Sequence, residues 1–130
     1  NMKRDFVNIK DVVKANMLVL INNKSNGHVF NIGGGKDISV YDFALKVGLI
    51  FGQDDIIPEV PGYYRFGDTR HACSDISKIK RILGWYPKFS IENSISEYKS
   101  YLEKQVNIEN ILDYQQKSMR KLNVIRKAKS

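Results

Sequence analysis

The side chains that could do chemistry are concentrated in one stretch, YYRFGDTRHACSDISK, which runs from Tyr63 to Lys78. It holds three basic groups, two carboxylates, a histidine and the only cysteine of the chain: Arg65, Arg70, Lys78, Asp68, Asp75, His71 and Cys73. A surface arginine is usually only solvated, so these residue types by themselves leave two interpretations open, a binding loop and a solvated loop.

The spacing within this stretch does not indicate a metal site or an activated thiol. His71 has no second histidine or cysteine at ligand spacing, because the other histidine, His28, lies in a predicted strand. We therefore expect His71 to serve packing or loop structure. Cys73 has no base beside it except His71, so we expect a small, buried, apolar side chain. Asp75 precedes a helical pattern and is expected to cap it.

A glycine cluster, NIGGGKDIS, follows a predicted strand and precedes a predicted helix. A dinucleotide-binding loop stands at such a junction and needs the spacing G-x-G-x-x-G, because its backbone must approach a pyrophosphate. Gly33 and Gly35 fit the first pair, but Ile38 occupies the third position. We therefore expect a strand-to-helix turn with unusual dihedral angles, and close approach of a ligand is the alternative.

The elements that must position these residues follow from hydrophobic periodicity and turn signals. Strands are predicted at 4–9 and 28–32, with one edge strand within the loop at 54–68. Helices are predicted at 12–23, 40–52, 76–85, 91–104 and 105–126. Their expected N-caps are Asp11, Ser39, Ser74 or Asp75, and Ser90 paired with Asn93. Gly52 and Gly84 are expected to end two of them. This order is α/β, but two clear strands are too few for an independent doubly wound sheet.

Composition indicates one globular unit of 130 residues with 42% hydrophobic residues. No stretch is long and apolar enough to span a bilayer, and a single cysteine suits the reducing cytoplasm. The net charge is +7, but residues 117–130 hold six basic and no acidic residues, which leaves +1 for residues 1–116. This distribution argues against a nucleic-acid-binding surface across the whole chain. We divide the chain into a body, 1–104, and a basic helical extension or tail, 105–130.

Three segments in order carry a resemblance to a known family: RDFVNIKDVVKANMLVL, then GHVFNIGGGKDISVYDFA, then RFGDTRHACSDISKIKRILGWYPKFSIENSISEY. They resemble the C-terminal part of the extended short-chain dehydrogenases/reductases, and most of all the NAD-dependent nucleotide-sugar epimerases and dehydratases such as UDP-hexose 4-epimerase. The resemblance spans residues 4–102. It implies an α/β fold made of the last strands of a Rossmann-type sheet and the substrate-binding lobe, without the N-terminal dinucleotide-binding half.

The resemblance also implies a set of substrate-binding residues. Arg4 and Arg65 match the two family arginines that grip the diphosphate of a nucleotide-diphosphate sugar, where a planar guanidinium meets two oxygens at once. Asp68 matches the acid that binds the nucleoside ribose, although it could instead be a turn residue after Gly67. Arg70 is expected to brace the loop.

Family catalysis uses NAD and a tyrosine followed four residues later by lysine, and this chain has no such pair. The seven tyrosines are followed at that spacing by Leu45, Gly67, Asp68, Ser90, Leu102, Gln105 and Ser118. We therefore expect no catalytic and no cofactor-binding residues on this chain. The resemblance implies that both lie on a missing N-terminal half, so that the chain is inactive alone. Homodimerisation stays open.

A function from a different class remains as an alternative. The basic end could make the chain a non-catalytic module that binds an acidic partner. The segment 105–126 could also mediate assembly, pack on the missing half or be loose, and the resemblance does not account for it.

Overall fold

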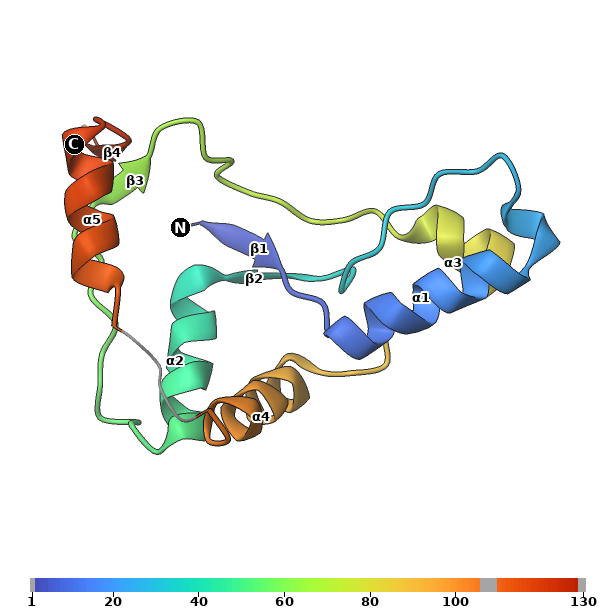
Figure 1. Cartoon of the computed structure of the whole chain (residues 1–130), viewed down its shortest axis with the longest axis horizontal. Helices are drawn as coiled ribbons and strands as arrows, with labels where there is room; N and C mark the ends of the chain where they lie inside the picture. Colours follow the sequence, from blue (N-terminus) through green and yellow to red (C-terminus); the bar gives the residue numbers. More distant parts are fainter. Residues whose placement is uncertain (1, 106–109, 129–130) are drawn as a thin grey trace.

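The computed structural model describes residues 2–105 and 110–128 and has a mixed α/β fold (Figure 1). Its strands are β1 (Lys3–Asp5), β2 (Asp37–Ser39), β3 (Tyr63–Arg65) and β4 (Ile125–Lys127). Its α-helices are α1 (Ile9–Ile21), α2 (Val40–Phe51), α3 (Ser77–Leu83), α4 (Ile91–Leu102) and α5 (Leu112–Lys121), with a 3₁₀ turn, η1, at Asn23–Ser25. The strands form two separate antiparallel pairs, β1 with β2 and β3 with β4.

The β1–β2 pair is extended on one side by the loop that follows β3. Arg4 lies opposite Ile38 in the antiparallel register. On the other side of β1, the N–H of Lys3 donates to the carbonyl of Arg70, and the N–H of Ala72 donates to the carbonyl of Lys3, both at 3.2 Å. These bonds fix the loop after β3 against the strand that carries Arg4.

Helix α1 starts earlier than the sequence predicts, and its cap is a different residue. Asn8 is the N-cap, and its side-chain oxygen accepts from the N–H of Lys10 at 2.8 Å. The expected strand over 4–9 is therefore limited to Lys3–Asp5. The prediction of Asp11 as the cap is wrong, because Asp11 is almost fully buried and its Oδ2 accepts from the backbone N–H groups of Lys88 and Phe89 at 2.9 and 3.0 Å.

Helices α2 and α4 pack together below β1 and β2 in the view of Figure 1. Each begins at its predicted serine: Ser39 caps α2 by accepting from the N–H of Asp42, and Ser90 caps α4 in a capping box with Asn93. Gly52 ends α2 and Gly84 ends α3 in the left-handed conformation, which confirms both stop signals. An ion pair of 2.6 Å between Lys46 and Glu92 joins the two packed helices.

The core is small and joins α1 to α3 and the segment after it. Ala15, Ile79 and Trp85 are buried together, with Phe30 and Ile32 partly buried against them. The predicted strand over 28–32 is wrong, because these residues form neither helix nor strand. They pass the core without strand pairing, and the strand of this region is β2 at Asp37–Ser39, where β1 offers a hydrogen-bonding edge.

The C-terminal part forms a third group with β3. The helix predicted over 105–126 is shorter, since α5 covers Leu112–Lys121, and residues 106–109 lie outside the described part of the chain. The backbone then turns at Asn123, which has a φ of 54°, and returns as β4 beside β3 (Figure 1).

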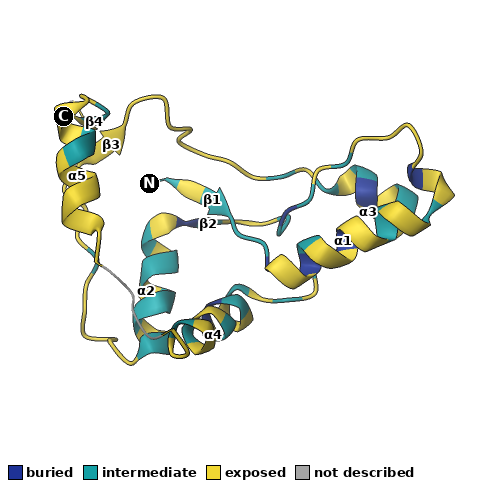
Figure 2. Cartoon of the chain, viewed as in Figure 1, coloured by how far each residue is buried: buried dark blue, intermediate teal, exposed yellow. Residues whose placement is uncertain are grey.

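Much of the chain is exposed (Figure 2), and the exposed residues include many large hydrophobic ones. The chain has 10332 Å² of solvent-accessible surface, whereas a compact monomer of this length has about 7,000 Å². Along α1, side chains at helical spacing are more than half exposed: Ile9, Val13, Met17, Leu20 and Ile21. Within the described residues, every helix is too short or too polar to cross a bilayer.

Candidate functional site

Arg4 and Asp68 form the centre of the candidate site. Nη2 of Arg4 donates to Oδ1 of Asp68 at 2.9 Å, and Nη1 donates to the carbonyls of Lys3 and Arg70 at 2.9 and 3.2 Å. Both side chains keep contact with solvent, at 24% exposure for Arg4 and 39% for Asp68. The backbone carbonyl of Arg70 thus takes part in holding the loop, and the bracing role expected of the Arg70 side chain stays a prediction.

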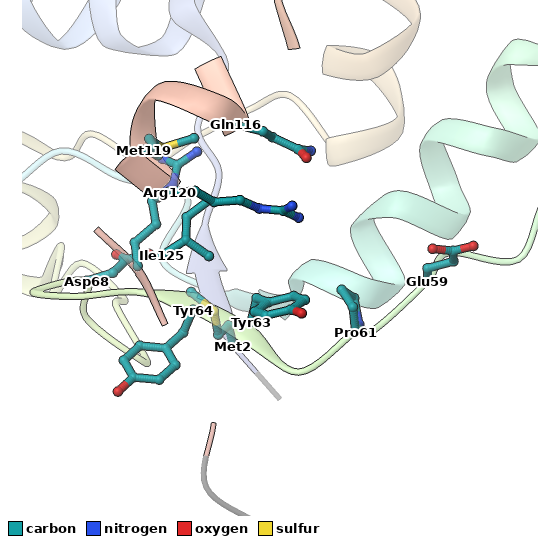
Figure 3. Close-up of a pocket in the computed structure, with 11 residues that line it drawn as sticks. Met2, Glu59, Pro61, Tyr63, Tyr64, Asp68, Gln116, Met119, Arg120 and Ile125 are labelled. Carbon is teal, nitrogen blue, oxygen red and sulfur yellow. The ribbon is translucent and has the colours of Figure 1, made fainter. Parts of the chain in front are cut away.

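Arg65 and Asp68 line one pocket with a volume of about 520 Å³ (Figure 3). This volume lies within the range of about 300–1,000 Å³ of small-molecule pockets, but most of the lining residues are exposed, so the site is an open hollow on the surface. Arg65 lies at the end of β3, and Asp68 follows in a turn in which its N–H donates to the carbonyl of Arg65 at 3.1 Å. Arg4 is not among the lining residues and reaches the pocket only through Asp68.

The position of the loop depends on a residue that the sequence analysis overlooked. Asp5 directly follows Arg4, and its Oδ2 accepts from the N–H of Ser74 at 3.0 Å and of Gly35 at 3.2 Å. One carboxylate therefore joins the three segments that carry the resemblance. The sequence signal for Asp5 was its position directly after Arg4, within the first segment that carries the resemblance.

Within the stretch Tyr63–Lys78, the contacts of Cys73 and His71 do not indicate a role in binding or catalysis. Cys73 is exposed, so the prediction of a buried thiol is wrong. Partial desolvation, followed by the charges of Asp5 and Asp37, raises the pKa of the Cys73 thiol, which keeps it protonated and weakly nucleophilic. His71 forms a backbone bridge with Lys3.

Asp75 stabilises the first turn of α3 although Ile76 occupies the N-cap position. Oδ1 of Asp75 accepts from the N–H of Ser77 at 2.9 Å. Hydrogen bonds from the side chain and then the backbone of Ser77 lower the pKa of Asp75. The prediction of Ser74 or Asp75 as the N-cap is therefore wrong, because the helix begins at Ser77 and the Asp75 carboxylate binds the N–H of Ser77 from outside the cap position.

The glycine cluster is a tight junction whose space is filled by the chain itself. Gly35 has a φ of 69°, which confirms the unusual dihedral angle. A Cβ at Gly33 would lie 2.5 Å from Cβ of Ser74 and would also clash with Asp5, and a Cβ at Gly35 would lie 2.7 Å from Cδ1 of Ile76. The close approach here is made by this chain's own side chains, so the junction does not fit NAD, whose pyrophosphate would need that space. Over residues 2–105 and 110–128, no three His, Cys, Asp or Glu side chains gather in a way that could hold a metal ion.

Comparisons with known proteins match most of this chain. The family described as GDP-mannose 4,6 dehydratase matches residues 1–98. The dTDP-L-rhamnose 4-epimerase of Burkholderia thailandensis is 34% identical over 110 residues, which are 85% of this chain and 30% of that protein.

Solved structures show the same likeness. The crystal structure of a UDP-glucose 4-epimerase from Thermotoga maritima with UDP-glucose is similar at a TM-score of 0.71 and 34% identity, over 82% of this chain and 33% of that one. A dTDP-glucose 4,6-dehydratase from Bacillus anthracis in complex with NAD is similar at a TM-score of 0.67 and 25% identity, over 81% and 32%. The chain spans about a third of the length of these proteins. Because the family match covers most of its residues in one continuous run, the chain belongs to the GDP-mannose 4,6 dehydratase family, among the nucleotide-sugar epimerases and dehydratases of the extended short-chain dehydrogenase/reductase type.

Proposed function

We propose that this chain is the nucleotide-sugar-binding part of an NAD-dependent epimerase or dehydratase, most like UDP-hexose 4-epimerase. The observation that carries the proposal is the contact of Arg4 with Asp68, together with the pocket that Asp68 shares with Arg65. These residues come from the first and third matching segments, which the fold brings together.

Each of these residues has a role that its chemistry allows. Arg65 binds the diphosphate, because its guanidinium presents paired donors to phosphate oxygens and makes no ion pair or side-chain hydrogen bond with another described residue. Asp68 accepts from a ribose hydroxyl through the oxygen that does not face Arg4. Arg4 acts by positioning Asp68, because its guanidinium donates to that carboxylate and to the carbonyls of Lys3 and Arg70 and does not line the pocket.

The cofactor and the catalytic pair belong, in this proposal, to a dinucleotide-binding half that the chain does not include. The glycine junction is filled by Asp5, Ser74 and Ile76, and no tyrosine precedes a lysine at the family spacing. The exposed apolar side of α1 and the excess of surface are the features that such a half would cover. The chain alone therefore has no turnover.

The test is the affinity of the protein that contains both parts for UDP-glucose, measured by titration calorimetry. Arg65→Ala removes a hydrogen-bonded charge that the ligand would cover, which costs about 1.5–3 kcal/mol or about 10–150-fold in Kd. Arg81→Ala is the matched control, because Arg81 lies on α3 and does not line the pocket. Equal affinities for the two variants would remove Arg65 from the site and overturn the assignment.

The alternative of an acidic partner bound through the basic end receives no comparable support. Arg126 lies 3.6 Å from the centroid of the Phe66 ring, and Arg120 lies 5.9 Å from that of Tyr63. Arg126 is thus used inside the β3–β4–α5 group, and Arg120 lines the pocket rather than an outer basic surface.

A further inference from the structure

The second wall of the pocket is built by residues beyond the family match. Of the 11 residues that line it, Gln116, Met119 and Arg120 lie on α5 and Ile125 lies on β4, whereas the match ends at residue 98. Figure 3 shows these side chains above Tyr63 and Tyr64 of β3. The C-terminal segment is therefore part of the site, although the resemblance gives it no role.

Strand β4 fixes the strand that carries Arg65. The N–H of Phe66 donates to the carbonyl of Val124 at 2.7 Å, and the N–H of Ala128 donates to that of Gly62 at 2.8 Å. Arg65 is paired with Ile125 in the register. Directly paired residues project from the same face of an antiparallel pair, which explains why both line the pocket.

Arg120 brings a second guanidinium into this pocket. Among the described residues, neither Arg65 nor Arg120 takes part in an ion pair or a side-chain hydrogen bond. The charge of Asp68 is balanced by Arg4 at 2.9 Å, and Glu59 lies at the far end of the lining, beyond Pro61 (Figure 3). The part of the pocket next to β3 therefore has an excess of positive charge, which a bound anion would neutralise.

The guanidinium of Arg120 lies over the Tyr63 ring. Cζ of Arg120 lies 5.9 Å from the ring centroid, within the range of a cation–π contact. An arginine positioned in this way loses less conformational freedom when it binds an oxyanion than a free surface arginine does.

We propose that Arg120, supplied by the C-terminal helix α5, binds the diphosphate of the nucleotide sugar together with Arg65. This inference rests on the proposed function, because that function supplies the anion. It assigns the extension, residues 112–128, to the substrate site as its second wall.

The test compares UDP with uridine as probes, on the protein that contains both parts, by titration calorimetry or by competition with UDP-glucose. Arg120→Ala weakens UDP binding about tenfold and leaves uridine binding unchanged, because only UDP carries the diphosphate. Arg120→Lys keeps the charge and loses the planar fork, so its affinity for UDP lies between that of the parent protein and that of Arg120→Ala. Lys121→Ala is the matched control, since it removes the same charge from the next position of α5 without lining the pocket.

Three outcomes are distinguishable. If Arg120→Ala and Lys121→Ala bind UDP equally while Arg65→Ala is weakened, this inference fails and the proposed function stands. If Arg65→Ala is also unchanged, the proposed function fails. Should Arg120→Ala disrupt α5, as seen in its circular dichroism, the decision passes to Arg120→Lys, whose UDP affinity must then lie below that of the parent protein.

Discussion

Arg4 and Asp68 lie 64 positions apart in the sequence, yet Nη2 of Arg4 is 2.9 Å from Oδ1 of Asp68. The contact exists because β1 forms backbone hydrogen bonds with the Arg70–Ala72 segment on the side that β2 leaves open. Asp5, the next residue, binds the N–H of Ser74 and of Gly35. Two successive side chains of β1, Arg4 and Asp5, thus hold the loop of the candidate site in position.

The Arg4–Asp68 pair is expected to make a small contribution to folding stability. Both side chains are partly exposed, and pairs of this kind contribute about 0.2–1 kcal/mol. A double-mutant cycle of Arg4→Ala and Asp68→Ala, with unfolding by urea followed by circular dichroism, measures the coupling. Strict additivity of the two single effects would show that the pair contributes nothing to stability, and its role would then be restricted to ligand binding.

Asp11 is expected to matter more for stability than any exposed carboxylate. Asp11→Ala removes the buried carboxylate that accepts from the partly buried N–H groups of Lys88 and Phe89, which costs about 1–3 kcal/mol in the free energy of unfolding. Asp11→Asn keeps an oxygen at the same place and is expected to cost less.

Asp54→Ala serves as the control for the Asp11 variants, because Asp54 is exposed in the loop after α2. Urea denaturation curves of the three variants provide the comparison. An Asp11→Ala variant as stable as Asp54→Ala would show that the buried contacts do not hold the α4 entry segment to α1.

The Lys46–Glu92 pair is expected to make stability depend on pH in the acid range. The hydrogen bond from Lys46, then those from the backbone and from Ser90, lower the pKa of Glu92 from 4.5 to about 2. A carboxyl with a lowered pKa in the folded state stabilises the fold above pH 4.5, and this contribution disappears as the pH falls toward 2.

The measurement for this pair is the difference in thermal midpoint between the parent chain and Glu92→Gln across that pH interval. The difference in thermal midpoint between the parent chain and Glu92→Gln is expected to shrink steadily on acidification. The difference between the parent chain and Lys46→Gln is expected to shrink in the same way. A difference that stays constant with pH would mean that the Glu92 carboxylate does not hold α2 to α4.

The starts of α2 and α4 and the ends of α2 and α3 could be read from the sequence, because their bonds are local. Ser39 and Ser90 accept from N–H groups three residues further on, and Gly52 and Gly84 need a left-handed backbone that only nearby atoms constrain. The residue types of the candidate site were available for the same reason, since the motif that holds Arg65 and Asp68 is a short, continuous stretch.

Tertiary structure decided the cases in which two local solutions were equally good. Asn8 and Asp11 can both cap a helix, and Asp11 lost this role because the segment at Lys88 and Phe89 buries it. Residues 28–32 have the composition of a strand, but they lack a paired edge, whereas Asp37–Ser39 lies beside β1.

The sequence by itself determined where α2 and α4 begin, where α2 and α3 end, and which segments resemble the family. The tertiary structure decided that Arg4 contacts Asp68 and that α5 and β4 return to form a wall of the pocket with Arg65. The reason is that local hydrogen bonds depend on residues within one turn, whereas strand pairing and burial depend on segments that meet only after the chain has folded.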